Sequence, residues 1–155
     1  MAEDLVIKET PTMGKGMFAN RDFKKDEFIL YFDGEVIDGF SKFPKDMQNH
    51  MFTLGGDKCL YPVPPWMYLN HSCDPNAGMR NDRDLIAFKD IKKGEEIFLD
   101  YAMNNTTDWT MECHCGSKNC RKIIGNFNML PEETKKRYFN YLNNRNKKAY
   151  LESHK

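Results

Sequence analysis

Glycine, proline and other turn-forming residues interrupt this chain before any apolar segment becomes long. Residues 28–32 (Phe-Ile-Leu-Tyr-Phe), for example, are followed at once by Asp33 and Gly34. Short apolar and aromatic runs bounded by such residues are typical of strands in a small β fold. We therefore expect short strands at residues 5–8, 28–32, 35–37, 50–54, 58–61, 85–88 and 97–99.

Helical segments are expected only as short pieces and at the C-terminus. Residues 38–49 lack periodicity, which indicates a surface connection with at most a turn or two of helix. Residues 131–142 begin with proline and acidic residues and continue with basic ones, the polarity that a helix dipole favours. We expect one C-terminal helix there, followed by a frayed basic tail.

The 155 residues provide enough apolar material for one compact domain. Basic and acidic residues balance at 23 each, so bulk charge gives no argument for a nucleic-acid or anionic-membrane surface. The acidic N-terminal residues 1–4 lack the basic flank of a secretory signal, and no apolar run approaches membrane-spanning length. The sequence predicts a soluble, intracellular protein.

Three of the five cysteines, Cys113, Cys115 and Cys120, fall in one short polar stretch. An odd number of cysteines argues against a simple disulfide framework, and thiolates at such spacing favour zinc. Disulfides or free thiols are the alternative, and the spacing alone leaves the fourth ligand open. Cys59, in an expected strand, is interpreted as a small buried apolar residue.

The densest group of hydrogen-bonding side chains is the run from Asn70 to Asn76 (Asn-His-Ser-Cys-Asp-Pro-Asn). Such residues also form ordinary turns, but a cysteine within the run and the aromatic residues before it favour a functional site. Near the N-terminus, Gly14 and Gly16 indicate either a tight turn or close approach of the backbone to another group.

Four motifs together resemble the SET-domain protein lysine methyltransferases. They are Gly14-x-Gly16, the run at residues 70–76, Gly94-Glu95-Glu96 followed by Asp100-Tyr101, and Cys113-x-Cys115-x4-Cys120. The resemblance extends from about residue 5 to residue 124 and includes the cysteine-rich segment that the family calls post-SET. It implies a SET domain at residues 1–112, a zinc-binding post-SET segment at 113–127 and a C-terminal helix and tail at 128–155.

The family fold is mainly β, a β-clip of small curled sheets with a knot-like C-terminal threading and short helices. By resemblance the chain binds S-adenosylmethionine and releases S-adenosylhomocysteine. Glycine is expected in the loop that contains Gly14 and Gly16, because a Cβ there would hold the main chain away from the cofactor. The resemblance assigns cofactor binding to Gly14, Lys15, Gly16, Met17, Asn70 and His71.

The resemblance also assigns the catalytic and metal residues. Tyr101 matches the family's catalytic tyrosine, and Asp100 is expected to be a structural partner rather than a base. Cys73 joins the three post-SET cysteines as the fourth zinc ligand, with His114 as a less suitable substitute. Zinc would then hold the post-SET segment against the loop that contains Asn70 and His71.

Three positions differ from the commonest family pattern. Many members have tyrosine in place of Phe32, a larger aromatic residue in place of Leu99, and arginine in place of Met67. Phe32 and Leu99 are the predicted substrate-pocket residues, and the loss of hydroxyl groups and volume there predicts a roomier, drier pocket. We therefore expect addition of two or three methyl groups to the target lysine.

The predicted partner is a lysine-containing protein or peptide, possibly a histone tail, with no direct nucleic-acid or membrane binding. The change to phenylalanine at position 32 also supports an alternative, a catalytically impaired SET-fold module that binds zinc and cofactor. A zinc module that binds nucleic acid is disfavoured by the neutral charge and the lack of a basic helix. Substrate specificity is expected to depend on surface loops such as residues 38–49, whose sequence does not indicate which protein is recognised.

Overall fold

The computed structural model describes residues 2–155, so Met1 of the predicted SET segment lies outside the described residues. Within them the strands are short, as the frequent turn residues predict. They are β1 (Leu5–Glu9), β2 (Lys15–Ala19), β3 (Phe28–Tyr31), β4 (Val36–Asp38), β5 (Phe52–Gly55), β6 (Lys58–Leu60), β7 (Asn70–His71), β8 (Ala77–Arg80), β9 (Asp84–Ala87), β10 (Phe98–Leu99), β11 (Met111–Glu112) and β12 (Ile123–Ile124).

Helices are few and short. The α-helices are α1 (Lys45–Gln48), α2 (Glu132–Tyr138) and α3 (Asn144–Ser153). The 3₁₀ helices are η1 (Ala2–Asp4), η2 (Phe40–Lys42), η3 (Trp66–Tyr68), η4 (Tyr101–Met103), η5 (Phe127–Met129) and η6 (Phe139–Tyr141). No helix among residues 2–155 is long and apolar enough to cross a membrane.

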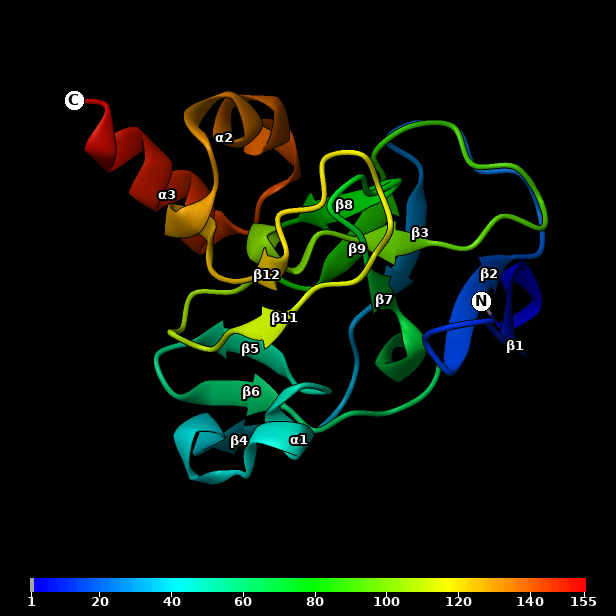
Figure 1. Cartoon of the computed structure of the whole chain (residues 1–155), viewed down its shortest axis with the longest axis horizontal. Helices are drawn as coiled ribbons and strands as arrows, with labels where there is room; N and C mark the ends of the chain where they lie inside the picture. Colours follow the sequence, from blue (N-terminus) through cyan, green and yellow to red (C-terminus); the bar gives the residue numbers. More distant parts are fainter. Residues whose placement is uncertain (1) are drawn as a thin grey trace.

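The strands form four small sheets rather than one large sheet. Strands β3, β9, β8, β10 and β7 make the central sheet, β4, β6 and β5 make a second sheet, and β1–β2 and β11–β12 are two-stranded. Figure 1 shows the β1–β2 hairpin at one end of the molecule and α2 and α3 at the other. The predicted mainly β class with several small sheets is confirmed.

The parallel strand β10 lies between β7 and β8, which are joined by residues 72–76. The amide N–H of Ser72 donates to the Leu99 carbonyl at 3.2 Å, and that of Asn76 donates to the Phe98 carbonyl at the same distance. Residues 98–99 therefore lie between the two strands that flank the loop, and the knot-like threading stays a prediction. As a consequence Tyr101, two residues after the end of β10, lies beside the 70–76 segment.

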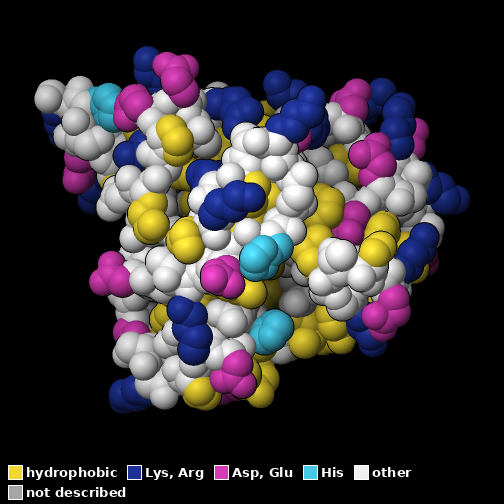
Figure 2. Space-filling model, in the orientation of Figure 1, with side chains coloured by type: hydrophobic (Ala, Val, Ile, Leu, Met, Phe, Trp, Pro, Cys, Tyr) yellow, Lys and Arg dark blue, Asp and Glu magenta, His cyan; other side chains and the backbone are white. Residues whose placement is uncertain are grey.

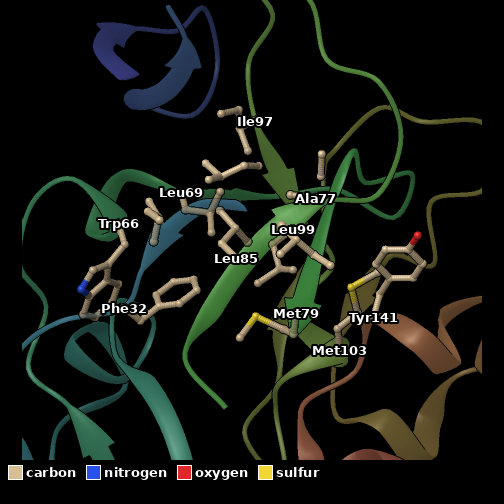
Figure 3. Packing of buried hydrophobic residues seen from close by; sticks show 14 of the residues in the cluster. Phe32, Trp66, Leu69, Ala77, Met79, Leu85, Ile97, Leu99, Met103 and Tyr141 are labelled. Carbon is tan, nitrogen blue, oxygen red and sulfur yellow. The ribbon is translucent and has the colours of Figure 1, made fainter. Parts of the chain in front are cut away.

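One hydrophobic core joins the central sheet to the surrounding elements. Figure 3 shows Phe32 and Trp66 packed at one side of this core and Met103 and Tyr141 at the other, with Leu99 of β10 between them. The C-terminal segment is therefore part of the same core as the central sheet.

The expected single C-terminal helix and frayed tail are wrong. Residues 131–142, expected to form one helix, contain α2 and the 3₁₀ helix η6. The basic residues beyond them form a further helix, α3. The side chain of Asn143 accepts a hydrogen bond from the Asn146 amide and caps α3, while Asn146 is buried and donates to the Met103 carbonyl at 3.0 Å. The tail is ordered because capping and buried polar contacts outweigh its polar composition.

Strands β2 and β8 are among those that were not expected. Residues 15–19, where Gly14 and Gly16 indicated a tight turn or a close approach of the backbone, form β2 paired with β1. Strand β8 was not predicted, although residues 77–79 are fully buried at the centre of the main sheet. Its residues, Ala-Gly-Met-Arg, include no β-branched or aromatic side chain that would indicate a strand.

Candidate active site and metal site

A cavity of about 620 Å³ lies between the central sheet, the β4–β6–β5 sheet and the cysteine-rich segment. Figure 2 shows hydrophobic side chains in a hollow on this face and histidine side chains beside it. Seven of the residues predicted to serve the cofactor, the substrate or catalysis line it. They are Gly14, Lys15, Phe32, Asn70, His71, Leu99 and Tyr101.

The side chain of Asn70 joins two walls of the cavity. Its amide nitrogen donates to the Lys15 carbonyl at 3.1 Å and to Glu96 Oε2 at 3.0 Å. Burial raises the pKa of the Glu96 carboxyl. Asn70 therefore fixes the backbone of β2 relative to the central sheet. Glu96 supports Asn70 through this hydrogen bond, a role that sequence reasoning did not give it.

Gly16 and Met17 lie behind the cavity wall. A Cβ on Gly16 would come within 2.6 Å of Glu96 Oε2 and 2.8 Å of Thr10 Cγ2, so the neighbour that requires glycine there is a side chain of this protein. Met17 is fully buried in the core. Their assignment to cofactor binding stays a prediction, and in this structure both residues support the wall.

Tyr101 is held at both its side chain and its backbone. Its hydroxyl donates to the Leu69 carbonyl, and its amide N–H donates to His71 Nδ1 at 3.0 Å. Burial raises the pKa of the Tyr101 phenol well above its ordinary value, so the side chain stays protonated at neutral pH and acts as a hydrogen-bond donor.

His71 connects Tyr101 to Cys73. Burial lowers the pKa of His71 to about 4, so the ring is neutral at pH 7. Because Nδ1 accepts from the Tyr101 amide, the ring proton is on Nε2, which lies 3.4 Å from Cys73 Sγ. The imidazole therefore donates toward the sulfur, an arrangement that suits a thiolate.

The four predicted metal ligands come together. The sulfur atoms of Cys73, Cys113, Cys115 and Cys120 all lie within 4.8 Å of one another. Those of Cys73 and Cys113 are 3.8 Å apart. Tetrahedral zinc at the usual Zn–S distance of about 2.3 Å places its sulfur ligands about 3.8 Å apart, so the cluster fits this ion.

The other candidates for the cluster lie outside it. The His114 side chain is 84% exposed, and Cys59 is buried in β6 beside Met51. None of the five cysteines, all of which lie among the described residues, forms a disulfide. Burial raises the pKa of Cys73 to about 11, so binding of a metal ion would have to displace a proton from this thiol.

Apolar side chains form the opposite wall of the cavity. The Phe32 and Phe52 rings stack at a centroid distance of 4.1 Å, and Trp66 meets both edge-on. Leu99 lies behind them in β10 and is 2% exposed. Both predicted pocket residues, Phe32 and Leu99, line the cavity, and their role in holding substrate stays a prediction.

Asp100 is a structural partner, as expected. It is fully buried, and its carboxylate accepts from Arg121 Nη2 at 2.8 Å and from the Tyr138 hydroxyl at 2.8 Å. Sequence reasoning missed Arg121 and Tyr138. The position of Arg121, directly after Cys120, is the one signal that could have indicated it.

The sequence model of the SET domain matches residues 14–102. That range is more than half of the chain and contains the Gly14 loop, Asn70, His71 and Tyr101. The chain belongs to the SET-domain family.

Curated relatives of this SET-domain chain are named as histone-lysine methyltransferases. "Histone-lysine N-methyltransferase Set2" of Drosophila melanogaster is 34% identical over 77% of this chain and 6% of its own length. The Candida albicans "Histone-lysine N-methyltransferase, H3 lysine-36 specific" is 29% identical over 77% of this chain and 16% of its own length. The chain thus spans less than a fifth of these relatives.

Solved structures share the fold. KRYPTONITE, in a complex with mCHG DNA and SAH, superposes with a TM-score of 0.63 at 19% identity, over 77% of this SET-domain chain and 28% of that one. The ctPRC2 structure bound to S-adenosylmethionine gives a TM-score of 0.57 at 24% identity, over 68% and 16% respectively.

Proposed function

We propose that this SET-domain chain is an S-adenosylmethionine-dependent protein-lysine N-methyltransferase. The observation that carries the proposal is the placement of Tyr101 beside His71, with Asn70, at a largely apolar cavity. Its relatives' names support the same reaction, with a histone or another lysine-containing protein as substrate. We infer an intracellular location from those histone-directed relatives.

The cofactor would be held by Gly14, Lys15, Asn70 and His71. The fit is supported by the cavity beside them and by the Asn70 amide, which fixes the Lys15 backbone at its edge. When bound, the sulfonium of S-adenosylmethionine supplies an electrophilic methyl group to a neutral lysine amine.

The chain's own residues would prepare the lysine in two ways. The apolar wall formed by Phe32, Phe52 and Trp66 lowers the pKa of a lysine amine placed against it, which favours the neutral form with a free lone pair. Tyr101, fixed through His71 and the Leu69 carbonyl, narrows the orientations open to that amine. Alignment of this kind can provide a large share of the reduction in the activation barrier of such transfers.

No side chain on the wall needs to act as a base. The buried carboxylate next to Tyr101 in the chain, that of Asp100, already accepts from Arg121, Tyr138 and the Ala102 amide. Proton loss to solvent before the amine enters the cavity is therefore the simpler route.

The wall also bears on the number of methyl groups. With Phe32 and Leu99 in place of larger or hydroxylated residues, the cavity keeps space for a methylated amine, and these two positions provide no hydroxyl that would hold its lone pair elsewhere. We propose di- or trimethyllysine as the product.

Zinc at Cys73, Cys113, Cys115 and Cys120 would have a structural role. Four thiolates fill its tetrahedral coordination and leave no position for a substrate. The ion would fix residues 113–120, several of which line the cavity, against the 70–76 segment.

The function is tested by incubating the chain with labelled S-adenosylmethionine and histones, with cell extract as a second substrate pool. Wild type should label protein, and Tyr101→Phe should lower the rate by about 10²-fold or more because an aligning group is lost. Mass spectrometry of a modified peptide should find di- or trimethyllysine. Cofactor binding without transfer would instead identify a binding module, and a product that stops at monomethyllysine under excess cofactor would contradict the pocket argument.

A further inference from the structure

Asp100 connects three segments that are far apart in the sequence. Its Oδ1 accepts from Arg121 Nη2 at 2.8 Å and from the Ala102 amide at 3.1 Å, and its Oδ2 accepts from the Tyr138 hydroxyl at 2.8 Å. Both Asp100 and Tyr138 have 0% exposure. A buried carboxylate with this set of donors has little freedom to move.

Arg121 extends these contacts to the cysteine cluster. Its backbone N–H donates to Cys73 Sγ at 3.4 Å, while its guanidinium holds Asp100. One residue therefore links a predicted metal ligand to the residue that precedes Tyr101.

Tyr138 extends them to the C-terminal helices. It lies at the end of α2, beyond the SET match at residues 14–102 and beyond the cysteine cluster. Its ring packs edge-on against Phe88 at a centroid distance of 5.7 Å, which fixes where its hydroxyl points. Helix α2 thus reaches the peptide that contains the candidate catalytic tyrosine.

We propose that Tyr138 and Arg121 are positioning residues that act on Tyr101 through Asp100. The inference rests on the proposed function and makes α2 a supporting part of the active site. Asp100 caps η4, whose first residue is Tyr101, so a displaced Asp100 carboxylate moves the backbone from which the catalytic side chain projects. Displacements of about 1 Å are sufficient to cost about 10²-fold in rate.

A pair of matched variants tests the proposal. Tyr138→Phe and Tyr141→Phe each remove one tyrosine hydroxyl from the same C-terminal segment, the first from Asp100 and the second from Asp26. Tyr138→Phe should lower kcat by about 10-fold with little change in KM for the cofactor, whereas Tyr141→Phe should leave both within about 2-fold. Both are assayed well below their melting temperatures.

A second measurement needs no catalysis. Amide hydrogen exchange in residues 113–122 should be about 10-fold faster in Tyr138→Phe than in wild type, because the Asp100 carboxylate that holds Arg121 is less firmly fixed. It should be unchanged in Tyr141→Phe. Arg121→Met should reproduce the Tyr138→Phe effects, and Arg121→Lys, which keeps a charged donor, should partly restore them.

The outcomes separate this inference from the proposed function. A wild-type chain without methyl transfer removes the proposed function, and the exchange measurement then decides the inference alone. Equal kcat and equal exchange in Tyr138→Phe and Tyr141→Phe would overturn the inference about Tyr138, because both hydroxyls would then serve stability only.

Discussion

At the scale of single residues, the requirement for glycine at position 16 has a cause that the sequence did not reveal. Gly14 has a φ of +67°, and its absent Cβ would meet no atom within 4 Å. Gly16 is the residue with close neighbours, the carboxylate of Glu96 and the Thr10 methyl group. The first glycine therefore serves backbone conformation, and the second serves packing.

Gly16→Ala should lower the free energy of unfolding by about 1–3 kcal/mol, the usual cost of overpacking. It should also weaken the Asn70–Glu96 contact, because Glu96 has to move to make room. A double-mutant cycle with Glu96→Ala measures this by denaturant unfolding, and we expect the two changes to couple by at least about 0.5 kcal/mol. Additive losses would show that Glu96 is not the neighbour that excludes a side chain at position 16.

At the scale of elements, the 70–76 segment has two faces. Asn70 and His71 line the cavity, while Cys73 lies in the cysteine cluster, and the His71 ring bridges the two. The insertion of β10 between β7 and β8 holds the ends of this segment. A change at the metal ligand should therefore reach the cavity through a single rigid loop.

Cys73→Ser should reduce bound zinc and lower methyl transfer together. Cys59→Ser is a matched control, because it places the same hydroxyl at another fully buried cysteine outside the cluster. It should keep one zinc per chain and most of the activity. Metal content by mass spectrometry and the labelled-cofactor assay check both variants. A Cys73→Ser protein that loses zinc but keeps full activity would break the proposed link.

At the scale of the whole molecule, the C-terminal segment belongs to the core. Tyr138, Tyr141 and Leu142 are buried in the same cluster as residues of the central sheet. Gly78 of β8 has no space for a Cβ because Tyr141 lies 2.6 Å from that position. These contacts predict that α2 and α3 unfold together with the SET fold.

Leu142→Ala should lower the free energy of unfolding by about 2–5 kcal/mol, as expected for a fully buried leucine. Leu151→Ala is the matched control, because Leu151 in α3 is 54% exposed and should cost less than about 0.5 kcal/mol. Urea unfolding followed by circular dichroism should give one transition in each case. A separate transition for the C-terminal segment would support the predicted division at residue 128.

The amino-acid sequence alone determined the mainly β class and most strand positions, because these depend on local turn residues. The candidate site residues came from motifs that resemble those of the SET-domain family. Tertiary structure alone decided that β10 inserts between β7 and β8 and that Glu96 contacts Asn70. It also decided that Arg121 and Tyr138 bind Asp100 and that the C-terminal residues form α3. Each of these depends on residues 20 or more positions apart that meet in the folded chain, such as Asn70 with Glu96 or Asp100 with Tyr138. No local pattern encodes which of the chain's many polar side chains will lie together.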